Sequence, residues 1–273
     1  RIHAYADFEA MLAAEKLDYV DIALPTDLHA EYTVRALEAG LHVFCEKPMA
    51  RSVAEAEQML AAARLAGRKL MIGQCLRFWP CYEVLIDAVR GGAFGPLSML
   101  SMSRISVISR KPWMFDGRRS GGALFDVRLH DVDFANCLLG KPAAVTATAC
   151  TRHTGAFDNV HAIYRYGAGM TVAAQASWGA TAFSMSYQAI FENAVMETIG
   201  NGAGVAIRRV GMPDEPVALA SGTGHERELA YFTECILHGR EPERCLPEST
   251  LDSLRIVTAE IASAEQNGAW IAL

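Results

Sequence analysis

The sequence lacks a dominant charge and long hydrophobic runs. Its 25 Lys and Arg residues stand against 31 Asp and Glu residues, which gives a formal net charge of −6 at pH 7. No basic block could neutralise a row of phosphates, so nucleic acid is not an expected partner. Charged residues or glycines interrupt the apolar stretches well short of the roughly 20 residues needed to cross a bilayer. We therefore expect no membrane span.

Paired cysteine motifs are also missing. The chain has seven cysteines but no C-x-x-C pair, which excludes a zinc ribbon and a dense disulfide framework. Seven cysteines without paired motifs predict reduced thiols in a cytoplasmic protein. The chain begins at Arg1 rather than Met, and we expect a segment upstream of it, where a signal peptide could lie.

Several catalytic and metal-binding motifs are absent as well. No G-x-S-x-G or P-loop sequence occurs. The glycine-rich run at 200–204 lies between two strand-like segments, so it is interpreted as a turn and not as a phosphate-binding loop. His225 and Glu226 begin an H-E-x-x-H pattern, but Leu229 occupies the position of the second histidine. The sequence therefore predicts no metal site.

Hydrophobic residues are plentiful. They make up 51% of the 273 residues, against 21% charged residues, so the chain can bury a large core. This balance excludes a disordered protein. The length favours one large domain or two domains that share a cleft.

The first 75 residues repeat a strand–helix–strand pattern. Apolar runs at 19–24, 42–45 and 70–73 are typical of buried strands, and helical stripes separate them. Ser52 begins an S-x-x-E capping pattern, and this pattern predicts the start of the second helix. Such units build a parallel sheet. We expect residues 1–75 to form the C-terminal half of a doubly wound Rossmann domain, with several tens of residues of its first half upstream.

The remaining residues, 76–273, show a different pattern. A helix expected at 82–90 is followed by period-two alternation, which is typical of half-buried antiparallel strands. The final helix is expected between Pro247 and Gly268. We predict a C-terminal α+β domain with a large, mostly antiparallel open sheet. Its expected strands are 145–149, 160–166, 170–178, 187–192, 195–199 and 205–210.

The segment Glu46-Lys47-Pro48 follows a predicted parallel strand at its carboxyl end. Ligands of open α/β sheets bind at that edge. A lysine there can donate hydrogen bonds to a ligand as a compact positive charge. The alternative is a surface lysine beside a proline that turns the chain.

A second segment, 121–134, combines two glycines with an apolar helical stripe. If one helix starts after the glycines, Asp126 and His130 share a face at i and i+4, about 5–6 Å apart at Cβ. A carboxylate bound to one ring nitrogen fixes the tautomer that a general base needs. The alternative is a carboxylate and a histidine on a solvated helix face. Asp131 and Asp133 are expected to be capping or surface residues.

These segments together resemble a known family. The motifs are Leu-Pro-Thr-Asp-Leu-His at 24–29, Ala-Gly-Leu-His-Val-Phe-Cys-Glu-Lys-Pro at 39–48, Arg-Phe at 77–78, and Gly-Gly-Ala-Leu-Phe-Asp-x-x-x-His-Asp-x-Asp at 121–133. Over essentially its whole length the chain is similar to the glucose-fructose oxidoreductase and inositol dehydrogenase family, called Gfo/Idh/MocA. The resemblance implies that the family's opening strand and G-x-G-x-x-G turn, about sixty residues, are not in this sequence.

The resemblance implies a dehydrogenase that uses NAD or NADP and oxidises a secondary alcohol of a sugar, cyclitol or related polyol. It also implies that Lys47, Asp126 and His130 are catalytic, with Lys47 contacting both the cofactor and the substrate hydroxyl. A homo-oligomer, a dimer or tetramer formed through the open sheet, is implied as well. A non-catalytic sugar- or dinucleotide-binding regulator of the same fold is the alternative function. The implied cofactor-binding residues are Pro25, Thr26, His29, Glu46, Lys47, Pro48 and Arg77.

Two further residues are expected near the substrate. Trp113 precedes the glycine pair and could lie near the nicotinamide or pack within its loop. Arg128 stands where relatives usually have glycine. Residues i and i+2 do not share a helix face, so Arg128 should point away from Asp126. Alternatively, its long cation reshapes the pocket in favour of an acidic substrate.

Overall fold

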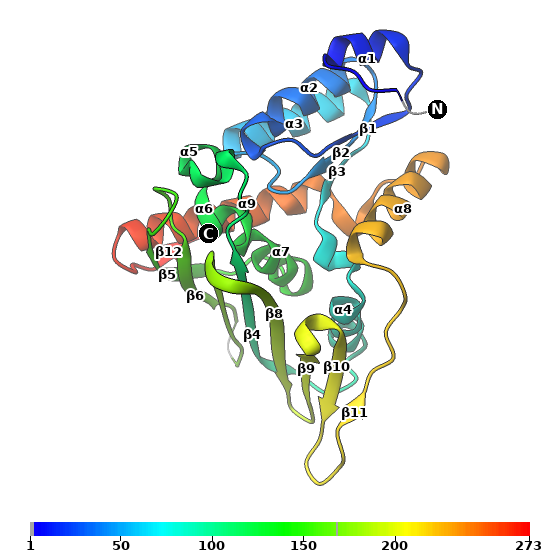
Figure 1. The fold of residues 1–273 in the computed structure, drawn as a ribbon. Coiled ribbons are helices and arrows are strands. Elements are labelled where there is room, and N and C mark those ends of the chain that lie inside the picture. The colour runs from blue at the N-terminus through cyan, green and yellow to red at the C-terminus, as the bar shows by residue number, and fades with distance from the viewer. Residues whose placement is uncertain (1–2, 168) are drawn as a thin grey trace.

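The computed structural model describes residues 3–167 and 169–273, and it contains two sheets joined by helices (Figure 1). The smaller sheet has three parallel strands in the order β1-β2-β3. This confirms the parallel, Rossmann-like arrangement expected near the N-terminus. The elements of this part are α1 (Phe8–Ala14), β1 (Tyr19–Ile22), η1 (Thr26–Leu28), α2 (His29–Glu38), β2 (His42–Glu46), α3 (Val53–Ala66) and β3 (Leu70–Gly73).

Local signals in the sequence explain where α3 begins and ends. The Ser52 side chain accepts a hydrogen bond from the backbone N–H of Glu55, which caps the first turn. Gly67 ends the helix at φ 60°, a left-handed conformation that glycine adopts without a steric penalty. The buried residues of α3 face the sheet and α2; they are Ala56, Met59, Leu60 and Ala63.

The larger sheet has nine strands in the order β11-β10-β9-β8-β4-β7-β6-β5-β12. All neighbours are antiparallel except β4 and β7, which are parallel, so the expected mostly antiparallel sheet is confirmed. The strands are β4 (Leu97–Val107), β5 (Ala144–Cys150), β6 (Asn159–Arg165), β7 (Thr171–Ser177), β8 (Gly179–Phe191), β9 (Val195–Ile199), β10 (Gly204–Arg208), β11 (Glu215–Pro216) and β12 (Ile271–Ala272). The turn expected at 200–202 is present as η4 (Gly200–Gly202) between β9 and β10.

The sequence prediction missed β4, a central strand. Its inward side chains alternate as in any half-buried strand, but one of them is Arg104, and serines occupy several outward positions. This composition hides the apolar alternation on which strand prediction depends.

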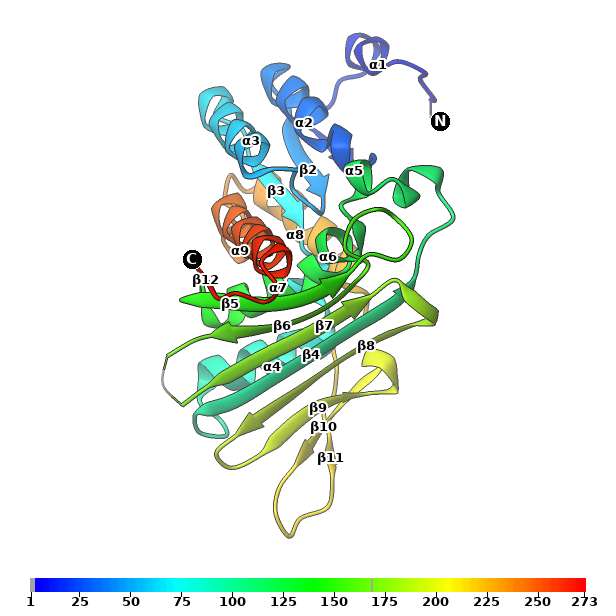
Figure 2. The same ribbon diagram turned by 90° about the vertical axis from the view of Figure 1, so that its left-hand side faces the viewer.

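Helices cover one face of the large sheet, and Figure 2 shows α4 and α7 behind its strands. The long helix α9 crosses between the sheets, in contact with α3, α7 and β5. The remaining elements are η2 (Cys75–Phe78), α4 (Pro80–Gly91), η3 (Pro112–Phe115), α5 (Gly117–Ser120), α6 (Gly122–Asp126), α7 (Arg128–Leu139), α8 (Gly224–Leu237), η5 (Glu243–Cys245) and α9 (Pro247–Glu265).

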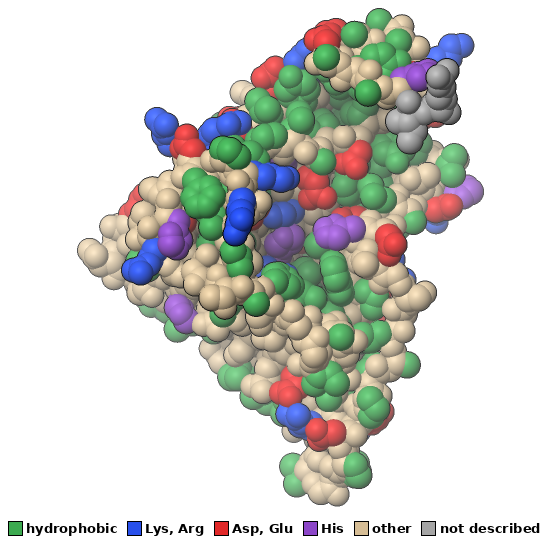
Figure 3. Space-filling view, in the orientation of Figure 1, with side chains coloured by type: hydrophobic (Ala, Val, Ile, Leu, Met, Phe, Trp, Pro, Cys, Tyr) green, Lys and Arg blue, Asp and Glu red, His purple; other side chains and the backbone are tan. Residues whose placement is uncertain are grey.

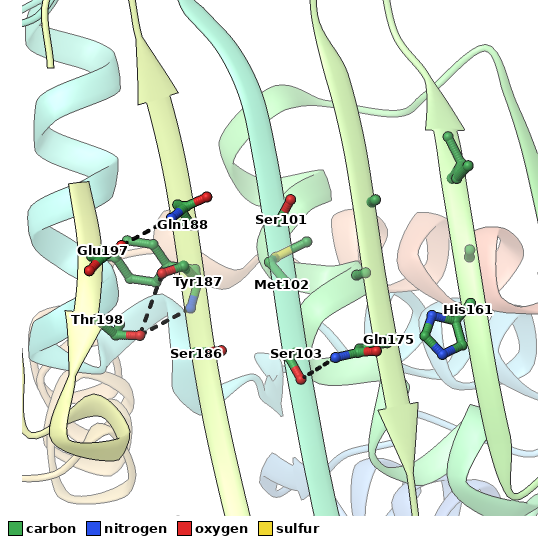
Figure 4. Close-up of a pocket in the computed structure, with 14 residues that line it drawn as sticks. Ser101, Met102, Ser103, His161, Gln175, Ser186, Tyr187, Gln188, Glu197 and Thr198 are labelled. Atoms are coloured by element: carbon green, nitrogen blue, oxygen red, sulfur yellow. Dashed lines mark hydrogen bonds between the residues drawn. The ribbon is translucent and has the colours of Figure 1, made fainter. Parts of the chain in front are cut away.

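The other face of the large sheet carries small and polar side chains around a shallow hollow of about 600 Å³. Figure 4 shows Ser103 of β4 and Gln175 of β7 joined by a hydrogen bond of 3.0 Å across neighbouring strands. His161 of β6 lies beside them. In β6, Ile163 leaves 49% of its surface exposed.

Within the described residues, no helix has both the length and the apolar character that a membrane crossing requires.

Candidate active site

Lys47 lies directly after β2 and reaches across to the C-terminal part of the chain. Its Nζ donates a hydrogen bond of 2.6 Å to Asp126 Oδ1 and another of 3.0 Å to the backbone carbonyl of Asp126. Both side chains are largely buried, with 14% and 19% of their surfaces exposed. The Lys47–Pro48 peptide bond is cis. The carboxyl end of a parallel strand thus delivers an ammonium group to the segment that carries Asp126 and His130.

The single helix expected after the glycines is divided. One helix, α6, ends at Asp126, and α7 begins at Arg128. Among the described residues, Asp126 makes its side-chain hydrogen bond with Lys47 and none with His130. The predicted carboxylate–imidazole hydrogen bond is therefore wrong. The Lys47 ammonium binds the carboxylate instead, because a charged donor is the stronger partner.

His130 belongs to the same site through its electrostatic surroundings. Its Nδ1 lies 3.9 Å from the Sγ atom of Cys75. Burial, and then the positive charges of Lys47 and Arg104, lower the pKa of His130 well below its usual range. The imidazole is therefore neutral at physiological pH and is able to accept a proton.

Three buried ion pairs fix α7 on both sides of His130. Arg128 Nε lies 3.2 Å from Glu260 Oε2 of α9, and Asp131 lies 3.1 Å from Arg104 of β4. Asp133, two residues further, pairs with Arg77 of η2. The expectation that Asp131 and Asp133 are capping or surface residues is wrong, because both carboxylates are buried against arginines.

Arg128 does point away from Asp126, as its position at i+2 predicts. Its side chain is fully buried, and its guanidinium binds Glu260 and the hydroxyl of Tyr164. This placement corrects the prediction that Arg128 contacts a substrate, since the cation has no exposed surface.

Arg77 is also placed differently from the expectation. Its Nε and Nη2 donate to the two carboxylate oxygens of Asp133 at 2.8 and 2.7 Å. Its Nη1 donates to Ser249 Oγ and to the carbonyl of Arg244. All three nitrogens are used within the protein, and the side chain is 4% exposed. The structure thus gives Arg77 an internal role and does not support direct contact with a cofactor.

The other expected cofactor-binding residues gather where β1 and β2 end. Pro25 and Thr26 follow β1 and enter η1, and Glu46 ends β2. His29 is buried between these loops, with Nδ1 2.7 Å from the Pro48 carbonyl oxygen and Nε2 2.8 Å from that of Leu24. His29 therefore links the two loops and has no free ring nitrogen for a ligand.

Trp113 lies in η3 and is half-buried, packed against the hydrophobic core. The loop that carries it is tied to η1 by the ion pair between Arg119 and Asp27, 2.8 Å long. This arrangement brings the loop close to the residues that follow β1. Whether Trp113 contacts a ligand stays a prediction.

The sequence analysis considered His225 only as part of an incomplete H-E-x-x-H pattern, and it overlooked Glu228 near the start of α8. His225 Nδ1 lies 3.2 Å from Oε1 of the buried Glu228, and both lie near Glu46. Figure 3 shows acidic, basic and histidine side chains gathered at a hollow between the two sheets. An i, i+3 pair on a helix was readable in the sequence, but its approach to β2 was not, because it depends on the tertiary fold.

Comparisons with known proteins agree with this architecture. The family model described as "Oxidoreductase family, NAD-binding Rossmann fold" matches residues 1–74, and the model of the GFO/IDH/MocA C-terminal domain matches residues 82–197. The chain therefore belongs to the Gfo/Idh/MocA family of oxidoreductases, as its motifs predicted.

Named relatives in this family include several sugar and cyclitol dehydrogenases. D-xylose 1-dehydrogenase (NADP(+)) 2 of Haloferax volcanii is 33% identical over 181 residues, which cover 64% of this chain and 54% of that protein. Inositol 2-dehydrogenase of Rhizobium meliloti is 33% identical over 168 residues, which cover 59% of this chain and 50% of that protein. The chain thus spans about half the length of these curated relatives.

Solved structures extend the likeness over nearly the whole chain. Aldose-aldose oxidoreductase from Caulobacter crescentus, complexed with glycerol, has a TM-score of 0.88 and 29% identity. That match covers 97% of this chain and 82% of the other. Levoglucosan dehydrogenase in complex with NADH and levoglucosan has a TM-score of 0.87 and 22% identity, and covers 98% and 83%. At 22% identity, the match to levoglucosan dehydrogenase shows that the two chains share a fold.

Proposed function

We propose that this protein is an NAD- or NADP-dependent dehydrogenase that oxidises a secondary alcohol of a sugar, cyclitol or related polyol. The observation that carries the proposal is the contact of Lys47 with Asp126 at 2.6 Å, beside an imidazole whose pKa is lowered. A largely buried ammonium–carboxylate pair beside an imidazole of lowered pKa, at the carboxyl edge of a parallel sheet, is typical of a catalytic site. The named dehydrogenases among the relatives support the same chemistry.

The residues present fit a nicotinamide dinucleotide at the ends of β1 and β2. Pro25, Thr26, Glu46 and Lys47 all lie at the carboxyl edge of the parallel sheet, where such cofactors bind. When bound, the nicotinamide supplies the hydride acceptor.

The chain's own groups then handle the proton and the developing charge. Neutral His130 accepts the proton of the substrate hydroxyl as general base. The Lys47 ammonium, held by Asp126, stabilises the negative charge that develops on the substrate oxygen. Asp126 thus acts by positioning Lys47, and not by orienting His130 as its helical spacing had suggested.

Turnover of polyols by the full-length protein tests this function. Purified protein is incubated with NAD⁺ or NADP⁺ and a panel that includes inositol, D-xylose and levoglucosan, and reduction of the nucleotide is followed by absorbance. We expect reduction with at least one polyol. Nucleotide binding without reduction across a broad panel would favour the alternative, a non-catalytic regulator of the same fold.

We further propose that the protein forms a homo-oligomer through the open face of the large sheet. Ile163 is half-exposed there, beside small and polar side chains around the hollow of about 600 Å³. Replacing Ile163 with aspartate should shift the protein toward monomers in light scattering coupled to gel filtration. Leu65→Lys, on the 91% exposed Leu65 of α3, is the control. A monomeric parent protein, or an Ile163→Asp variant with unchanged mass, would contradict the proposal.

We also propose a cytoplasmic location and a division into two domains, at residues 1–75 and 76–273. All seven cysteines are free, which supports a reducing compartment.

The small parallel sheet ends at Gly73 and the large sheet begins at Leu97, which supports the division into domains at residues 1–75 and 76–273.

A further inference from the structure

Glu46, His225 and Glu228 form a group of side chains that could hold a metal ion. The proposed proton transfer uses none of them, although Glu46 also lies at the edge proposed to bind the nucleotide. Each offers one ligand atom, and these three atoms lie within 4.8 Å of one another. His225 Nδ1 and Glu228 Oε1 are 3.2 Å apart. We refer to these three residues as the EHE cluster.

The fold brings the EHE cluster together from two separate parts of the chain. Glu46 is the last residue of β2, whereas His225 and Glu228 lie in the first two turns of α8 at i and i+3. Helix α8 packs against β2, β3 and η2. A side chain in place of Gly224 would bring its Cβ within 2.4 Å of the Cys75 carbonyl oxygen, so the glycine permits this close packing.

The start of α8 is also held in place by its own contacts. Thr223 and Glu226 form a capping box, in which each side chain binds the backbone N–H of the other residue. The rings of His225 and Trp79 lie nearly perpendicular in a T-shaped arrangement, with 5.7 Å between centroids. These contacts fix the direction from which the imidazole approaches Glu46 and Glu228.

Glu228 provides the independent sign of a missing ligand. Its side chain is 1% exposed, and its Oε2 accepts no hydrogen bond from the residues that the structure describes. A buried carboxylate oxygen without a partner is unfavourable, because burial has removed its hydrogen bonds to water and no protein group has replaced them. An orphaned oxygen of this kind in a cluster of ligating side chains points to a bound cation.

The charges around the cluster point the same way. Glu46 and Glu228 are both carboxylates, and Asp21 adds a third negative charge close to Glu46. The neighbouring cation, Lys47, already binds Asp126. A divalent ion would balance the two carboxylates of the cluster and give the buried Glu228 a charged partner.

We propose that Glu46, His225 and Glu228 bind a divalent transition-metal cation, with Zn²⁺ or Mn²⁺ as the ions best suited to one imidazole and two carboxylates. Ligands around a tetrahedral zinc ion lie about 3.3–3.6 Å apart for bonds of about 2.0–2.2 Å. The 3.2 Å between His225 and Glu228 is close to such an edge. Three protein ligands leave a fourth position open.

Metal titration of the chelator-stripped protein tests the proposal without any nucleotide or substrate. Co²⁺ is followed by its visible absorption and Zn²⁺ by calorimetry. We expect one equivalent to bind, and His225→Ala, Glu46→Gln and Glu228→Gln each to weaken binding by at least about tenfold. His238→Ala is the matched control, because His238 pairs with exposed Glu234 at the other end of α8 and should leave the affinity unchanged.

Two results would overturn the proposal. One is the absence of one-equivalent binding by the parent protein, which would mean that the cluster shares a proton or water instead. The other is binding that His225→Ala leaves unchanged, which would place the ion elsewhere. The side chain of His225 is 55% exposed, so its replacement should keep the fold even where Glu228→Gln does not. The measurement requires no catalysis and is therefore independent of the proposed dehydrogenase activity.

Discussion

Replacing His130 by alanine should lower kcat/KM for polyol oxidation by about 10²–10⁴-fold, the usual contribution of a general base. Burial, together with Lys47 and Arg104, lowers the pKa of His130 well below 6.5, so the imidazole is neutral and ready to accept a proton at pH 7. Nucleotide affinity should change little, because the substitution removes the group that receives the substrate proton.

The pH profile separates this role from a structural one. In the parent enzyme, kcat/KM should stay high as the pH falls through 6.5 and decline only at lower pH, because protonation of His130 requires a pH below its depressed pKa. That acidic decline should disappear in His130→Ala. The control is His238→Ala on the exposed end of α8. Parent-level turnover by His130→Ala on a confirmed substrate would refute the assignment of His130 as base.

Lys47 could be located from the sequence because its position depends on local patterns. The apolar run of β2, the capping residue Ser52 and the following strand define a strand–helix–strand unit, and such a unit places the residue after β2 at the ligand-binding edge. Nothing in these patterns requires knowledge of distant residues. The structure accordingly finds Lys47 at this edge, with its side chain directed toward Asp126.

The partner of Asp126 could not be read in the same way. Spacing at i and i+4 suggested His130, but an ammonium group from another part of the chain competes for the carboxylate and binds it. The partners of Arg77 and Arg128 are likewise remote in sequence. Spacing along a helix correctly predicted that Arg128 would turn away from Asp126, and it could not predict what the guanidinium would meet there.

Replacing Arg128 by methionine should lower the free energy of unfolding by about 3–5 kcal/mol, the usual cost of removing one partner from a buried ion pair. Arg128 and Glu260 both have fully buried side chains. Without the guanidinium, the hydroxyl of Tyr164 would be the one partner left to the Glu260 carboxylate among the residues that the structure describes. The exposed pair between Arg64 and Glu248 supplies the matched control, since Arg64→Met should cost no more than about 1 kcal/mol.

The loss of unfolding free energy in Arg128→Met should depend on pH, because the buried Glu260 carboxyl remains without its arginine. Burial already raises the pKa of Glu260, and removal of Arg128 should raise it further. A carboxyl whose folded-state pKa exceeds its unfolded value favours the folded state when protonated, so the variant should lose stability as the pH rises from about 5 to 8. Urea unfolding of Arg128→Met and the parent at both pH values measures this difference.

A double variant distinguishes an unpaired charge from a simple packing defect. In Arg128→Met combined with Glu260→Met, no buried charge remains, and the unfolding free energy should recover much of the loss, since apolar replacements of a whole buried pair are often neutral or stabilising. The pH dependence should then return to that of the parent. A single variant within about 1 kcal/mol of the parent would show that this pair contributes little to the contact of α7 with α9. A double variant no more stable than the single one would assign the loss to packing and contradict the unpaired charge as its cause.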